Sequence, residues 1–170
     1  MKSLIIYRIL SYPVITIAAF LILVVLGILP TALSNPIFLL TVFVLACVII
    51  YSFASWRFLT RGIDNRQPCK PLLRDLIRVN SFFTIGLAVL LLLDVLFILA
   101  QPSFLNDTAE KAMGSLSSEA GFTKSKVISM LRFFVGFFLV YGILLLAHVY
   151  FTFRLLKEHR GLFDHKPEQP

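Results

Sequence analysis

The sequence contains few charged residues, and long parts of it contain none. Charged side chains make up 15% of the 170 residues, whereas 58% of the residues are hydrophobic. Residues 9–56 and 133–153 carry no charge, and Asp94 is the single charged residue within 79–106. A soluble domain needs charged and polar side chains over its surface, so this composition excludes a soluble fold.

Cysteine is also scarce, which limits metal and disulfide chemistry. Cys47 lies in an apolar stretch and Cys69 lies in a basic segment. No C-x-x-C pair occurs, and no histidine lies near either cysteine at the spacing of a metal site. The sequence therefore predicts no disulfide framework, no metal site and no cofactor.

Catalytic signatures are absent as well. The chain has no Gly-rich phosphate loop, no H-E-x-x-H or G-x-S-x-G motif and no carboxylates paired at catalytic spacing. We therefore expect that the protein is not an enzyme, and no residue is a catalytic candidate. The net charge of +7 does not indicate nucleic-acid binding, because the basic residues lie between the apolar stretches, where membrane insertion requires them.

Four long apolar stretches dominate what is present. A hydrocarbon core about 30 Å thick needs roughly 20 helical residues, and lipid forces every backbone amide to pair within its own helix. The sequence thus predicts an all-α integral membrane protein with a single domain, an antiparallel bundle of four transmembrane helices. The predicted segments are a first span at about 13–29, a second at 36–59, a basic loop at 60–78, a third span at 79–101, an outer loop at 102–128, a fourth span at 129–156 and a tail at 157–170.

Local signals predict where several helices begin and end. Ser11 suits an N-cap, with Pro13 in the first turn of span one. Pro102 ends span three, and Thr123 caps the residues that lead into span four. Asp107 has capping-box spacing to an acidic residue three positions later, so we expect a short helix to begin there.

The distribution of Lys and Arg predicts the orientation. Twelve of the 16 basic residues lie in three segments that the four spans place on one side of the membrane. These segments are residues 1–8, residues 57–78 and the tail from Arg154 onward. Short loops rich in Lys and Arg stay in the cytoplasm, so both termini are predicted to be cytoplasmic. The compact build and small loops favour the inner membrane of a bacterium.

Span three contains the one acidic residue within a predicted span. Asp94 belongs to a series with Asn80, Leu87 and Gln101, which recur every seven residues. Seven residues come within about 20° of two full helical turns, so these positions form a stripe that we expect to face the bundle interior. An ionisable residue inside the membrane is a functional candidate, since burying its charge is costly.

Other spans offer polar partners to Asp94. Thr41 and Tyr141 fall at a similar depth, which allows a hydrogen-bonded layer, and His148 lies nearer the cytoplasm on the stripe of Tyr141. Two interpretations stay open. Asp94, Tyr141 and His148 could form a proton relay, or these residues could join helices through hydrogen bonds worth about 0.6 to 2 kcal/mol each.

Four basic residues before span three are candidates for contact with lipid headgroups. Arg66, Lys70, Arg74 and Arg78 recur every four residues, with leucines between them. A helix from Pro71 onward would be amphipathic, with arginines on anionic lipid at about 1 kcal/mol each. The alternative is that these residues only set the orientation.

The sequence therefore favours an interaction or accessory module of the membrane. Its expected partners are the bilayer, an anionic phospholipid, and a second copy or another membrane protein. The alternative is a small transporter or proton-linked channel that uses Asp94, Tyr141 and His148. A dry, packed interior would favour the first function, and a hydrated path past Asp94 would favour the second.

Overall fold

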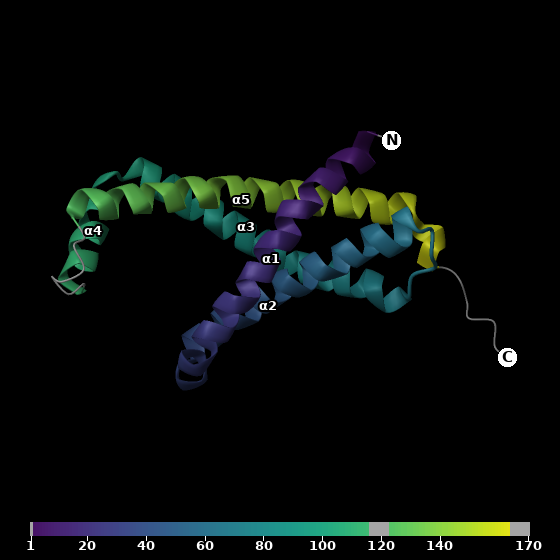
Figure 1. The fold of residues 1–170 in the computed structure, drawn as a ribbon, viewed down its shortest axis with the longest axis horizontal. Coiled ribbons are helices and arrows are strands. Elements are labelled where there is room, and N and C mark those ends of the chain that lie inside the picture. The colour runs from purple at the N-terminus through teal and green to yellow at the C-terminus, as the bar shows by residue number, and fades with distance from the viewer. Residues whose placement is uncertain (1, 116–122, 164–170) are drawn as a thin grey trace. The chain divides into compact units, whose positions relative to one another are not determined.

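The chain is helical throughout the part that the computed structural model describes, residues 2–115 and 123–163, and no strand occurs there. A π-helix, η1, directly continues α2, and a short 3-10 helix, η3, follows α5 (Figure 1). The bounds are α1 Lys2–Ser34, α2 Pro36–Arg57, η1 Phe58–Asp64, α3 Pro71–Ala100, α4 Ser103–Ser115, α5 Lys124–Glu158 and η3 Arg160–Phe163. The predicted all-α class is confirmed.

Four of the described helices are long and apolar enough to cross a membrane. The most apolar part of each has a mean hydropathy between 2.2 and 2.8. These spans are Ser3–Ser34, Pro36–Asp64, Pro71–Ala100 and Lys124–Glu158. The chain is thus a multi-pass helical membrane protein, as its apolar stretches predict.

Contacts divide the chain into two compact units. The first unit comprises Met1–Leu87 and Leu144–Pro170, and the second comprises Ala88–Ile143. Helices α3 and α5 each contribute one part to each unit. A single membrane domain stays a prediction.

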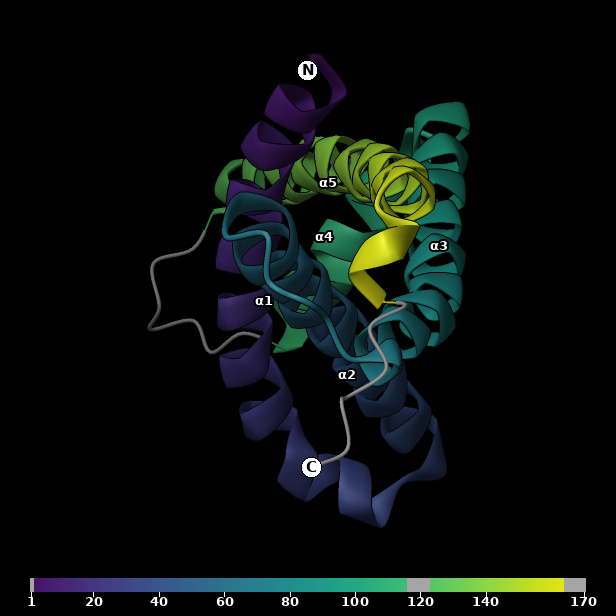
Figure 2. The same cartoon turned by 90° about the vertical axis from the view of Figure 1, so that its right-hand side faces the viewer.

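In the first unit, α1 and α2 pack against each other on either side of Asn35 (Figures 1 and 2). The backbone N–H of Asn35 donates to the Ala32 carbonyl at 3.2 Å. Its side-chain oxygen accepts from the N–H of Ile37 at 3.0 Å, and Pro36 occupies the first helical position. A side-chain cap followed by proline starts a helix without leaving an unsatisfied donor, so one residue is enough to connect the two helices.

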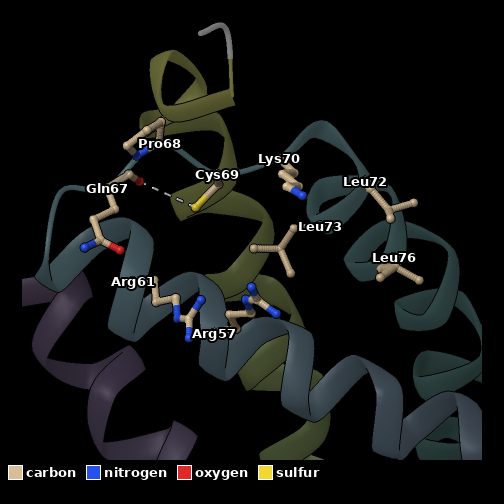
Figure 3. A pocket seen from close by; sticks show the side chains of 9 residues that line it. All are labelled: Arg57, Arg61, Gln67, Pro68, Cys69, Lys70, Leu72, Leu73 and Leu76. Carbon is tan, nitrogen blue, oxygen red and sulfur yellow. Dashed lines mark hydrogen bonds between the residues drawn. The ribbon is translucent and has the colours of Figure 1, made fainter. Parts of the chain in front are cut away.

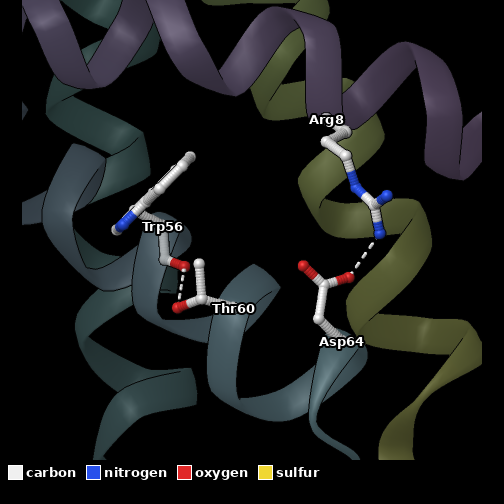
Figure 4. Close-up of polar contacts among 4 residues, drawn as sticks. All are labelled: Arg8, Trp56, Thr60 and Asp64. Carbon is white, nitrogen blue, oxygen red and sulfur yellow. Dashed lines mark hydrogen bonds and ion pairs between the residues drawn. The ribbon is translucent and has the colours of Figure 1, made fainter.

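Large apolar side chains from several helices form the core of this unit. Tyr7, Tyr51, Phe58, Ile77 and Leu155 are all fully or almost fully buried. An ion pair lies beside this core, where the Arg8 guanidinium of α1 donates to the Asp64 carboxylate of η1 at 2.6 Å (Figure 4). The pair joins the start of α1 to the end of η1.

In the second unit, α3 and α5 approach closely at Gly142. A Cβ added there would lie 3.1 Å from the side chain of Leu92 and 3.3 Å from the Ala88 carbonyl oxygen. Helix α4 is attached to α5 by the ion pair between Glu110 and Lys124. A small residue at a helix crossing is typical of membrane bundles, where packing rather than hydrophobicity holds helices together.

Two predicted helix starts are wrong, and two other predicted boundaries are confirmed. Helix α1 begins at Lys2 and continues through Pro13, so Ser11 is not an N-cap, and its hydroxyl donates to the Tyr7 carbonyl at 2.8 Å. Helix α4 begins at Ser103 rather than at Asp107. Helix α3 ends before Pro102 as expected, and Thr123 accepts from the N–H groups of α5 as predicted. Apolar surroundings penalise unpaired backbone groups, so a membrane helix continues past a proline that would end a soluble one.

Candidate functional site

Polar side chains from α1, α2 and α5 meet around a buried histidine in the first unit. Four of these residues are fully buried, namely Tyr7, Tyr51, His148 and Thr152, and Ser11 is 2% exposed. These five residues form what we call the His148 cluster. The Tyr7 ring stacks on the imidazole with ring centroids 5.0 Å apart.

Both ring nitrogens of His148 have hydroxyl partners. Nε2 lies 3.1 Å from Ser11 Oγ, and Nδ1 lies 2.8 Å from the Tyr51 hydroxyl. The Tyr51 hydroxyl also lies 2.9 Å from Thr152 Oγ1. Because hydroxyls both donate and accept, either tautomer of a neutral imidazole finds partners here.

The Tyr7 hydroxyl donates outside the cluster, to the Ser55 carbonyl, and the contacts of the other four side chains outnumber their protons by one when His148 is neutral. Five contacts are short enough, because Ser11 also donates to the Tyr7 carbonyl and Thr152 also donates to the His148 carbonyl. Ser11, Tyr51, Thr152 and a neutral imidazole supply one proton each. Only a protonated His148 would fill all five contacts at once. No carboxylate of the described residues forms a hydrogen bond with the cluster.

Asp94 lies in the second unit and is exposed on the surface of α3. It borders a groove of about 420 Å³ whose other lining residues are all apolar, among them Leu91, Phe97 and Phe138. The expectation that Asp94 faces the interior is therefore wrong for this chain on its own. In a membrane, this carboxyl group would face lipid unless something covers it.

The geometry of α3 explains this placement. Of the predicted stripe, Asn80 is buried, Leu87 is half-buried, and Asp94 and Gln101 are exposed. A seven-residue series drifts by about 20° per repeat on a straight helix, so the stripe turns away from the buried face. Ser81, Ala88 and Val95 stay buried along the helix, so Asn80 lies at the edge of the buried face and Asp94 lies beyond that edge.

The predicted layer of Thr41, Asp94 and Tyr141 stays a prediction, because Thr41 belongs to the first unit and the other two residues belong to the second. The Thr41 side chain is exposed and donates to the Ile37 carbonyl at 3.3 Å. Tyr141 is 5% exposed, and its hydroxyl has no hydrogen-bond partner among the described residues. His148 belongs to the first unit, whereas Asp94 and Tyr141 belong to the second.

Basic residues surround a pocket of about 450 Å³ in the first unit (Figure 3). Of the four predicted headgroup contacts, only Lys70 lines it, and Arg66, Arg74 and Arg78 do not. Arg57 and Arg61 line it instead, beside Cys69. Burial raises the pKa of the Cys69 thiol, and the positive charge of Arg57 opposes this shift.

Sequence reasoning missed the partners of His148, although their spacing offered a signal. Tyr7 with Ser11, Tyr51 with Ser55 and His148 with Thr152 are each four residues apart, so each pair lies on one face of its helix. Three such pairs on three apolar helices indicate a shared polar contact.

No protein-family model, no curated protein and no solved structure matches the chain.

Proposed function

We propose that the protein is an accessory interaction module of a membrane, and that it acts by self-association through the α3 face that carries Asp94. The observation that supports this proposal is the exposure of a carboxyl group in an apolar groove. A charged side chain facing lipid is costly, and polar groups in membranes usually bond to a neighbouring helix. A contact with another helix would cover Asp94.

A second copy of the chain is the partner whose chemistry fits. A protonated carboxyl group both donates and accepts, so two Asp94 side chains can pair with each other across a two-fold axis. Leu90 and Phe97, four residues before and three residues after Asp94 on the same helical face, are 58% and 50% exposed and would add apolar contact. The interface would therefore be polar at one point and apolar around it.

The proposed setting is the inner membrane of a bacterium, with both termini in the cytoplasm and the spans arranged as an antiparallel bundle. The excess of Lys and Arg on one side supports this orientation. The buried, hydrogen-bonded His148 cluster supports a packed interior rather than a hydrated path. The function proposed for the chain is therefore contact within the membrane, without catalysis.

Self-association can be measured by energy transfer between labelled copies in liposomes at a series of protein-to-lipid ratios. We expect Asp94→Leu to weaken the dimer about 3- to 30-fold, the equivalent of about 0.6 to 2 kcal/mol. Asp94→Asn should retain most of the association, because an amide also donates and accepts.

The matched control is the double variant Asp94→Leu/Leu96→Asp, which keeps the composition and moves the carboxyl group to another exposed face of α3. This variant should associate as weakly as Asp94→Leu. Wild-type association in the double variant, or the absence of any dimer in the unchanged protein, would contradict the proposal.

A second candidate function is proton-linked transport, and the proton count of the His148 cluster favours it. One contact in the cluster stays unfilled until a further proton binds. Proton flux into liposomes should then be lost in His148→Asn and kept in Tyr150→Phe, since Tyr150 is an exposed neighbour on α5. Equal flux in the wild type and in His148→Asn would rule this function out.

A further inference from the structure

The basic pocket of the first unit combines positive charge with an apolar edge. Arg57, Arg61 and Lys70 contribute the charge, and no carboxylate is present among its described lining residues. Leu72 and Leu76 are 65% and 37% exposed at the other side of the pocket. A ligand that suits both parts is an anion attached to an apolar chain.

Arg57 and Arg61 are neighbours on one helical face. They are four residues apart at the junction of α2 and η1, and Figure 3 shows both guanidinium groups on the same wall of the pocket. Like charges at this spacing repel each other, and an anion between them would convert that repulsion into two attractive contacts. Guanidinium groups bind phosphate oxygens with two parallel N–H donors, which makes phosphate the best match.

Backbone hydrogen bonds hold the pocket in shape. The Gln67 N–H donates to the Arg61 carbonyl at 3.0 Å, and the Cys69 N–H donates to the Leu162 carbonyl at 2.8 Å. Gly62 packs so closely that an added Cβ would lie 2.9 Å from Cys69 Sγ. The loop is thus fixed at η1 and at η3, so little ordering would be needed when a ligand binds.

The pocket also lies at the ends of two candidate membrane spans. Arg57 is the last residue of α2, and Leu72 and Leu73 belong to the first turn of α3. Span ends are where headgroups occur, and the positive end of the α3 dipole adds to the positive charge there. The exposed leucines would meet the upper part of an acyl chain.

We propose that this pocket binds the phosphate group of an anionic phospholipid, with Arg57, Arg61 and Lys70 around the phosphate and the leucines of α3 against the lipid's apolar part.

The test is a titration of the purified full-length protein in neutral detergent with phosphatidylglycerol, followed by native mass spectrometry. The variant Arg57→Gln/Arg61→Gln should bind about 30-fold more weakly, at about 1 kcal/mol for each cation removed. The control Arg66→Gln/Arg78→Gln removes the same charge from exposed residues outside the pocket and should change binding less than threefold. Equal weakening in both variants would overturn the proposal, because it would indicate diffuse attraction to the whole basic surface.

Two further arms identify the ligand. Phosphatidylcholine should not bind at the concentration that saturates with phosphatidylglycerol, and equal binding of the two lipids would contradict the proposal. Inorganic phosphate at about 10 mM, where charge screening is still weak, should leave the lipid bound. Complete displacement by inorganic phosphate would assign the pocket to free phosphate instead.

A further measurement leaves every pocket residue unchanged, so its result does not depend on whether the arginine variants fold. Cys69 lines the pocket, and Cys47 is buried, so Cys47→Ala leaves Cys69 as the one thiol of the chain. Phosphatidylglycerol should slow alkylation of Cys69, whereas phosphatidylcholine should not. An alkylation rate that phosphatidylglycerol does not change would count against the site.

Discussion

The two units differ in how their polar side chains are partnered. In the first unit, the side chains of Ser11, Tyr51 and His148 bond to one another across three helices. In the second unit, Asp94 is exposed in an apolar groove, and the buried Tyr141 hydroxyl has no partner among the described residues. The polar side chains of the His148 cluster are therefore partnered with one another, whereas Asp94 and Tyr141 have no side-chain hydrogen-bond partner among the described residues.

This difference assigns different roles to polar residues within one membrane protein. Hydrogen bonds between helices fix which faces meet, because a mismatched face leaves polar groups unpaired in an apolar environment. The His148 cluster does this for α1, α2 and α5. The exposed Asp94 carboxyl group makes no such contact with the described residues, so its effect should be on association rather than on folding.

Replacing His148 should give the largest effect on stability. In His148→Leu, the buried hydroxyls of Ser11 and Tyr51 each lose a partner, and we expect the free energy of unfolding to fall by about 2 to 3 kcal/mol. The measurement is unfolding by sodium dodecyl sulfate, followed by circular dichroism. Tyr150→Leu, at an exposed neighbour, should stay within about 0.5 kcal/mol of the wild type. Equal losses in both variants would show that the cluster does not hold the first unit together.

Two tyrosine variants compare the units directly. Tyr51→Phe removes a hydroxyl that contacts His148 and Thr152, and it should lower the free energy of unfolding by about 1 kcal/mol. Tyr141→Phe removes a buried hydroxyl that has no partner among the residues described, so stability should stay constant or rise by up to about 1 kcal/mol. The same unfolding assay measures both. A larger loss in Tyr141→Phe would mean that its hydroxyl has a partner in the folded protein.

Much of the fold could be predicted because span length and hydrophobicity follow directly from the bilayer. The four apolar stretches, the end of α3 before Pro102 and the Thr123 cap all depend on local sequence. The start of α1 could not be predicted from Ser11 and Pro13, because rules derived from soluble helices underestimate how far lipid extends a helix.

The sites were harder to predict, since they depend on which faces of different helices meet. A heptad count placed Asp94 on the same face as Asn80, yet the drift of a straight helix carries Asp94 to the surface. Of the four predicted basic residues only Lys70 lines the pocket, because contacts between η1 and the loop after it select Arg57 and Arg61 over Arg66. Contacts between helices are a tertiary property that no single segment encodes.

The smallest effect concerns the ion pair that the second unit forms within itself. Lys124, through its hydrogen bond and its charge, lowers the pKa of Glu110 below the usual value of 4.5. A folded pKa below the unfolded one means that the pair stabilises the fold above about pH 4.5 and that this contribution disappears as the pH falls through the folded pKa. Both side chains are exposed, so salt should weaken the effect.

The carboxyl chemical shift of Glu110, followed by NMR during a pH titration, tests this expectation directly. Lys124→Gln should return the Glu110 pKa to its usual range, whereas Lys111→Gln should leave it low because Lys111 does not contribute to the shift. Titration of Glu110 at its usual pH in the unchanged protein would show that α4 is not attached to α5 by this pair. The second unit would then lack this polar contact between α4 and α5, and the contrast with the hydrogen-bonded first unit would be sharper still.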